Sequence, residues 1–166
     1  MKGTKKLTIW PLPGGRDSHF QVVLDFLAFI SKDGKPYNDA KQWFPNTFST
    51  VNGEYRAGGY LDVLLRQLGL VKKDHNENVK LTLEGREVLY TKSKEKLYQI
   101  LDSRIVGISE IIRILKQKPS TVKELFEILK AELKTKWEKT NQLRYRLGWL
   151  ISLQKIEKQG NHYHAI

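Results

Sequence analysis

The sequence predicts a mostly α-helical, α+β fold made of two units that repeat one plan. Apolar residues recur at helical spacing over several stretches, which predicts amphipathic helices. In each unit an apolar helix end leads directly into a basic strand, at 66–73 and again at 151–158. A turn-rich segment follows each strand, at 74–78 and at 159–161, and favours a short β-hairpin. The repeat lies in the plan rather than in residue identity.

The second unit, residues 108–166, carries the clearest signals. Pro119 ends a helix predicted over 109–118, and Thr121 with Glu124 forms a capping box that opens the next. Thr140 is the expected N-cap of a further helix. Gly160 lies in the turn of the expected hairpin. Each of the last two helices has one apolar stripe: Val122, Leu125, Phe126, Leu129 and Leu133, then Leu143, Leu147, Leu150 and Ile151.

The first unit, residues 1–91, opens with an arm at 1–19 whose prolines and glycines argue against regular structure. Ile9, Trp10 and Leu12 are expected to pack the arm onto the body. A connecting helix is expected within 92–107, with an apolar face that joins the units. The remaining elements are predicted as helices at 20–32, 38–44 (ended by Pro45), 56–68 and 83–90, and strands at 69–73 and 79–82.

Helices followed by a basic hairpin are the plan of a winged helix-turn-helix, so the sequence predicts tandem winged helix-turn-helix units with short β-hairpin wings. An α-helix fits the major groove of DNA, where residues near its N-terminus reach base edges. Asn, Gln and Arg pair bidentately with adenine or guanine, and they occupy the first turns of the helix after Thr140. Tyr145 and Trp149 are expected on the same outward face.

The chain is basic, and the excess charge is uneven. Its 166 residues hold 29 Lys and Arg against 18 Asp and Glu, which gives +11 and a pI near 9.7. Residues 1–91 hold 13 basic and 10 acidic residues, and 92–166 hold 16 and 8. A pI above about 9 is typical of nucleic-acid binding, so double-stranded DNA is the expected partner. Anionic membranes, or a Lys-rich composition without a ligand, would also account for the charge.

The candidate DNA contacts follow from this plan. The N-terminal turns of the 140–152 helix are expected to read bases, and the wing lysines to hold phosphates. Alternatively, Arg144 and Arg146 pair with Glu138 or Glu132 and are only solvent-exposed charges on the helix surface. The full candidate set is Tyr55, Arg56, Lys72, Lys73, Thr140, Asn141, Gln142, Arg144, Tyr145, Arg146, Lys155, Lys158, Asn161 and His162.

Catalytic chemistry is not indicated. The sequence has no acidic residue followed by a Glu-x-Lys nuclease motif, no phosphate-binding loop and no Ser/His/Asp arrangement. His162 and His164 alternate on a strand, but a third metal ligand is not evident. Cysteine is absent. We therefore expect no catalytic residue, no metal and no cofactor, and a binding module rather than an enzyme.

No stretch reaches the ~18 apolar residues of a membrane span, and the N-terminus has no signal-peptide pattern. The sequence therefore predicts no membrane partner and a cytoplasmic location.

Two segments, Gly58-Gly-Tyr-Leu-Asp-Val-Leu-Leu-Arg-Gln-Leu-Gly-Leu-Val-Lys72 and Leu81-Thr-Leu-Glu-Gly-Arg-Glu-Val-Leu89, resemble the winged-helix recognition regions of type IIS restriction endonucleases. Residues 140–158 are similar to the last winged helix of restriction-associated proteins. The resemblance implies the target-recognition domain of a restriction or defence endonuclease, sequence- or methylation-specific, with cleavage by a separate nuclease domain or subunit. A winged-helix transcriptional regulator, a metal-dependent nuclease with an unrecognised motif and a protein-interaction scaffold are the alternatives.

Overall fold

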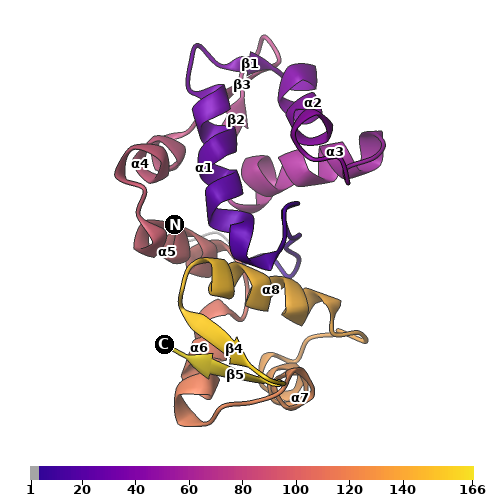
Figure 1. The fold of residues 1–166 in the computed structure, drawn as a ribbon, viewed down its shortest axis with the longest axis vertical. Coiled ribbons are helices and arrows are strands. Elements are labelled where there is room, and N and C mark those ends of the chain that lie inside the picture. Colours follow the sequence, from indigo (N-terminus) through magenta and orange to yellow (C-terminus); the bar gives the residue numbers. More distant parts are fainter. Residues whose placement is uncertain (1–3) are drawn as a thin grey trace.

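The chain forms a mostly α-helical α+β fold with two small antiparallel sheets, as seen in a computed structural model that describes residues 4–166 (Figure 1). The first three residues of the expected N-terminal arm lie outside the described residues. One sheet lies at each end of the long axis, and helix α8 crosses the molecule between them (Figure 1). The predicted mostly-α fold class is therefore confirmed.

The first half begins with a 3-10 turn, contains a three-stranded antiparallel sheet and ends with helix α4. Strand β3 is central, with Lys35 of β1 opposite Val79 and Val71 of β2 opposite Leu81. The elements are α1 (His19–Ile30), β1 (Lys35–Pro36), α2 (Tyr37–Thr47), α3 (Glu54–Asp62) with a π-helical continuation (Val63–Gln67), β2 (Val71–Lys73), β3 (Asn78–Leu81) and α4 (Leu83–Thr91), after the 3-10 turn (Arg16–Ser18).

The second half repeats this order of elements. It contains α5 (Lys94–Arg104), α6 (Ile108–Gln117), α7 (Val122–Leu133), α8 (Asn141–Ser152), β4 (Ile156–Gln159) and β5 (His162–Ala165). Ser120, just before α7, exchanges two backbone hydrogen bonds with Tyr163 of β5. Ser120 therefore occupies beside β5 the place that β1 occupies beside β3, and both halves have the same order of extended segments.

The helix starts follow local chemistry. Thr121 caps α7 with the complete capping box, because its hydroxyl accepts from the Glu124 amide and the Glu124 side chain accepts from the Thr121 amide. Thr82 and Ser93 cap α4 and α5 in the simpler way. Thr140 precedes α8 without a side-chain cap bond to the helix backbone.

Helix α2 does not end at Pro45, as the sequence predicted, but continues to Thr47. Its last turn is held by an aromatic cluster in which Trp43 packs edge-on against both Phe44 and Phe48. A proline near a helix end loses only one backbone hydrogen bond, so this packing outweighs the cost.

The N-terminal arm, residues 4–12, runs between the two halves and bonds to both. Lys6 exchanges backbone hydrogen bonds with the residues on either side of Ile105, just after α5. The Trp10 amide donates to Gln67 Oε1 at 2.9 Å, and the Trp10 carbonyl accepts from the Trp149 indole at 2.9 Å. The predicted packing of Ile9 and Leu12 is confirmed, since both are buried.

Candidate nucleic-acid interface

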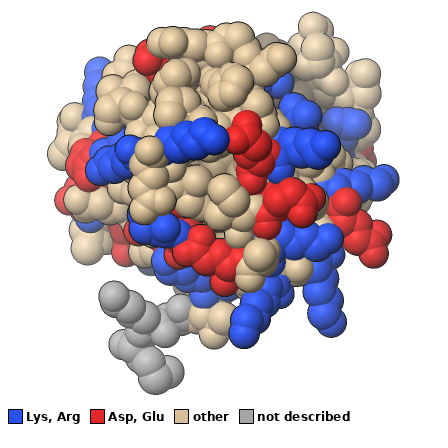
Figure 2. Space-filling view, turned by 90° about the horizontal axis from the view of Figure 1, so that it is seen from below, with Lys and Arg blue, Asp and Glu red and all other residues tan. Residues whose placement is uncertain are grey.

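A small cavity of about 270 Å³ lies where α7, α8 and the β4–β5 hairpin meet, at the end of the molecule viewed in Figure 2. Figure 2 shows Lys and Arg side chains spread over this end, with Asp and Glu between them. The lining is rich in cations and hydrogen-bonding groups: Thr121, Val122, Lys123, Arg144, Lys158, Asn161 and Tyr163.

Each cation at this cavity is placed by a different element. Lys123 lies in the first turn of α7, where the backbone N–H groups also point outward. Arg144 lies in the first turns of α8 and is oriented by a hydrogen bond from its Nε to Thr140 Oγ1 at 3.1 Å. Lys158 lies on β4 with its Nζ 5.7 Å from the centre of the Tyr163 ring. All three are exposed, and within residues 4–166 none forms an ion pair.

Glu124, the neighbour of Lys123 in the sequence, is already engaged. Hydrogen bonds from Thr121 lower the pKa of Glu124, with smaller contributions from Lys118 and His162. The Glu124 carboxylate accepts its hydrogen bonds from Thr121 in the capping box. Lys123, Arg144 and Lys158 therefore face solvent together with the Asn161 amide. Of the expected contacts, the structure brings together Arg144, Lys158 and Asn161. Asn141 and His162 are exposed nearby on the same elements, and Tyr145 is half-buried.

Gln142 and Arg146, expected to contact DNA, instead hold the N-terminal arm. Gln142 Oε1 accepts from the Ile9 amide at 3.0 Å and from Arg146 at 2.9 Å. The Arg146 guanidinium is fully buried and donates to the Leu7, Val106 and Gln142 carbonyls at 2.7–2.9 Å.

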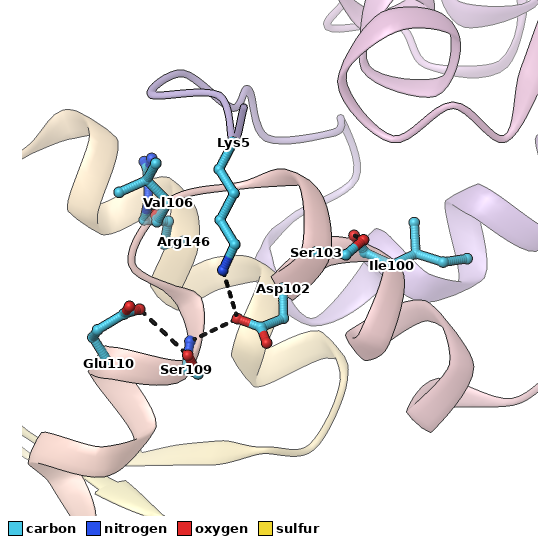
Figure 3. A network of polar contacts seen from close by, with 8 residues as sticks. All are labelled: Lys5, Ile100, Asp102, Ser103, Val106, Ser109, Glu110 and Arg146. Carbon is cyan, nitrogen blue, oxygen red and sulfur yellow. Dashed lines mark hydrogen bonds and ion pairs between the residues drawn. The ribbon is translucent and has the colours of Figure 1, made fainter. Parts of the chain in front are cut away.

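Arg146 has no carboxylate partner within the described residues. Its guanidinium lies 4.6 Å from the Trp137 ring centre, and burial lowers its pKa to about 10. Figure 3 places it beside Val106, close to a polar network of Lys5, Asp102, Ser109 and Glu110 that links the arm to α5 and α6. The alternative in which Arg146 is a solvent-exposed charge paired with Glu138 or Glu132 is wrong, because Arg146 is fully buried and Glu132 pairs with Arg113.

The sequence contained a signal for this burial. Arg146 follows Leu143 by three residues and precedes Leu150 by four, which places it on the apolar stripe of α8. Trp149, expected on the outward face, follows Gln142 by seven residues and is likewise fully buried. It packs against the buried ring of His19, at 4.9 Å between centroids.

Lys155 also differs from its expected role at the wing. Its Nζ forms an ion pair with Glu95 of α5 and lies 4.5 Å from the Tyr98 ring centre. The pair lowers the pKa of Glu95, chiefly through the hydrogen bond from Lys155. Lys155 therefore joins the hairpin to the connecting helix.

The corresponding face of the first half is less positive. Tyr55 and Arg56 are exposed on α3, and Lys72 is exposed on β2. Lys73, however, pairs with Glu77 at 3.2 Å and lies 4.9 Å from the Tyr37 ring centre. Lys41 pairs with Glu54. The free positive charge therefore concentrates at the second half, in line with the charge distribution along the sequence.

No family model, curated protein or solved structure matches this chain. Among the described residues, no group of three or more His, Asp or Glu side chains is arranged to hold a metal ion. None of the described helices has the length and apolar character needed to span a membrane.

Proposed function

We propose that the two halves are tandem winged helices and that the chain binds double-stranded DNA through the α7–α8–hairpin face. One observation carries the proposal: Lys123, Arg144, Lys158 and Asn161, from three separate elements, line one cavity at the start of α8. Cations and amide groups gathered on a face of helices and a hairpin suit DNA phosphates and base edges.

The shared element order supports the winged-helix assignment. In both halves a single extended segment pairs with the last strand, and the hairpin follows the helix that would enter the groove. Only the first two turns of α8 present exposed side chains, because its C-terminal half packs against α1 and the 3-10 turn. Recognition from the N-terminal residues of such a helix is the usual geometry.

The biological role we favour is the target-recognition domain of a restriction or defence endonuclease, with a cytoplasmic location and a nuclease domain or subunit as partner. The support is the sequence resemblance of 58–72 and 81–89. Selection of bound duplexes from a random pool that includes methylated sites tests this role. A single enriched site that is asymmetric, or that requires methylation, supports it, whereas palindromic half-sites would favour a transcriptional regulator.

DNA binding itself is tested by fluorescence anisotropy of a labelled duplex across a salt series. The triple variant K123Q/R144Q/K158Q should weaken binding to every duplex and reduce the salt slope by about two, because Lys123 and Lys158 each leave one phosphate without its partner. The loss of Arg144 should in addition reduce the preference for the cognate sequence. The matched control is K32Q/R86Q/K92Q, which removes the same charge from exposed positions outside the cavity. Equal losses of affinity in the two variants would mean that net charge, not this face, determines binding, and would contradict the proposal.

A further inference from the structure

A groove of about 920 Å³ lies between the N-terminal arm and α3, away from the α7–α8 face. Its walls combine the aromatic rings of Trp10 and Tyr55 with the arm lysines Lys5 and Lys6. The volume lies within the range of ligand pockets.

Tyr55 is the unusual side chain here. It is 80% exposed, and its ring touches the groove wall only edge-on, with its centroid 5.8 Å from that of Trp10. Trp10 is itself held edge-on against Tyr60 at 5.9 Å and is half-buried. The face of the Tyr55 ring is therefore open to a flat partner, beside a rigid aromatic wall.

Two adjacent helical glycines, Gly58 and Gly59, line the floor of the groove, and only one of them is required by the packing of the protein. A Cβ on Gly59 would lie 2.3 Å from the Trp10 ring, so Trp10 requires glycine at that position. A Cβ on Gly58 would have only Lys41 Cδ nearby, at 4.0 Å, so protein packing does not require glycine there. Glycine inside a helix costs about 1 kcal/mol relative to alanine. Gly58 lies one turn after Tyr55 on the same helix face, where it leaves a bare backbone surface.

The charges around the groove favour an anionic ligand. The two acidic groups are engaged, since Glu54 pairs with Lys41 and Asp62 pairs with Arg66 at 3.1 Å. Lys6 Nζ donates to the Arg66 carbonyl, a neutral acceptor, and retains its full charge and further donors. Lys5 Nζ forms an ion pair with Asp102 Oδ1 at 3.8 Å, outside hydrogen-bonding distance, so its N–H donors remain available.

We propose that this groove binds an unpaired nucleotide, with its base stacked on Tyr55 over Gly58 and its phosphate near Lys5 and Lys6. Bases of any sequence stack on aromatic rings, and neighbouring cations hold the backbone. The inference rests on the proposed nucleic-acid binding but concerns a separate surface, so the two can fail independently. The nucleotide comes either from a single strand or from an extrahelical position in a duplex, and the chemistry is the same.

The test uses the full chain and four probes: a paired duplex, the same duplex with one bulged nucleotide, a single strand of matched length and a free nucleoside monophosphate. Each oligonucleotide carries the fluorescent base 2-aminopurine at the position that is unpaired in the bulged probe. We expect the parent protein to bind the bulged duplex or the single strand more tightly than the paired duplex, with quenching of the probe. Y55A should lower that affinity at least about tenfold and abolish the quenching, while binding to the paired duplex is unchanged.

Two further variants keep the result interpretable. G58A adds one methyl group to the floor without a protein clash, so it should weaken binding of the unpaired base without loss of thermal stability. Y90A removes an equally exposed tyrosine on α4, 73% exposed, and should change nothing.

Equal affinity for paired and bulged duplexes, unaffected by Y55A, would overturn this inference and leave duplex binding standing. Single-strand binding that depends on Tyr55, without duplex binding, would support the groove and overturn the proposed function. Absence of binding to all four probes would overturn both.

Discussion

Arg144 and Arg146 lie two residues apart on α8, yet one faces solvent and the other is fully buried. Arg144→Ala should leave the free energy of unfolding nearly unchanged. It should weaken cognate DNA binding by about 1–3 kcal/mol if the guanidinium makes a bidentate base contact. Arg146→Ala removes four part-buried hydrogen bonds of a fully buried guanidinium and should lower the free energy of unfolding by about 3 kcal/mol or more.

Urea unfolding and duplex binding of the two variants separate these roles. The pair serves as its own control, because each variant loses one arginine from the same helix. A stable Arg146→Ala protein with impaired DNA binding would contradict the positioning role of Arg146 and restore it as a DNA contact.

His19 is a buried titratable group between α1 and α8, with 2% of its surface exposed. Burial lowers its pKa from 6.5 to about 4, against a smaller opposing effect of the Gly15 backbone. Between these pH values the unfolded chain binds a proton that the folded chain rejects. Its contribution to stability is therefore complete above pH 6.5 and falls as the pH drops to 4, by about 3 kcal/mol in total.

Urea unfolding at pH 7, 5.5 and 4, with tryptophan fluorescence as readout, measures this loss. His19→Gln removes the titration, so the variant should lose about 3 kcal/mol less than the parent over that range. Parallel pH curves for the parent and the variant would show that other groups cause the acid sensitivity.

At the scale of elements, the sequence predicted most helices to within a few residues, because each has an apolar stripe and a local start or stop signal. The predicted 20–32 helix forms over His19–Ile30, and Thr121 begins α7 with its capping box. Strand β1 was not predicted, since two residues with a proline have no strand pattern and pair only through contact with β3. The basic cavity was predicted in part, through Arg144, Lys158 and Asn161. Lys123 was not predicted, because no sequence pattern distinguishes it from other solvent-exposed lysines on a helix.

Gly85 determines how α4 packs against the first sheet. A Cβ at this position would lie 2.0 Å from the Leu70 carbonyl oxygen, which also accepts from the Thr82 amide at 3.1 Å. Because the added methyl group would clash with backbone atoms, Gly85→Ala should displace α4 and lower the free energy of unfolding by about 2–3 kcal/mol.

Gly58→Ala is the matched control, since an added methyl group there meets open space and should raise the free energy of unfolding by up to about 1 kcal/mol. Thermal unfolding by circular dichroism compares the two, and similar melting temperatures would contradict this account of α4.

At the scale of the whole molecule, the arm explains why sequence reasoning misplaced several α8 side chains. Arg146 and Leu7 are 139 residues apart in the sequence, so no local sequence pattern predicts their contact. Arg146 and Gln142, which were assigned to DNA, bind the arm instead, as does the buried Trp149. The arm in turn bonds to Gln67 of the first half. The two halves therefore share one interior.

This shared interior predicts that the halves unfold together and that loosening the arm uncouples them. The side chains of Gln67 and Gln142 supply the acceptors for the Trp10 and Ile9 amides, one from each half. The double variant Q67A/Q142A leaves both amides without these partners and should lower the free energy of unfolding by roughly 2–4 kcal/mol.

Hydrogen exchange followed by mass spectrometry in increasing urea reports each half separately. In the parent, peptides from α2 and from α7 should converge on one global opening, as in a single cooperative unit. In the variant, α7 should open at lower urea than α2, because the second half has the smaller independent core. Q21A/Q117A, which truncates one exposed glutamine on α1 and one on α6, away from the arm contacts, is the control. Separate openings already present in the parent would show that the arm bonds do not couple the halves.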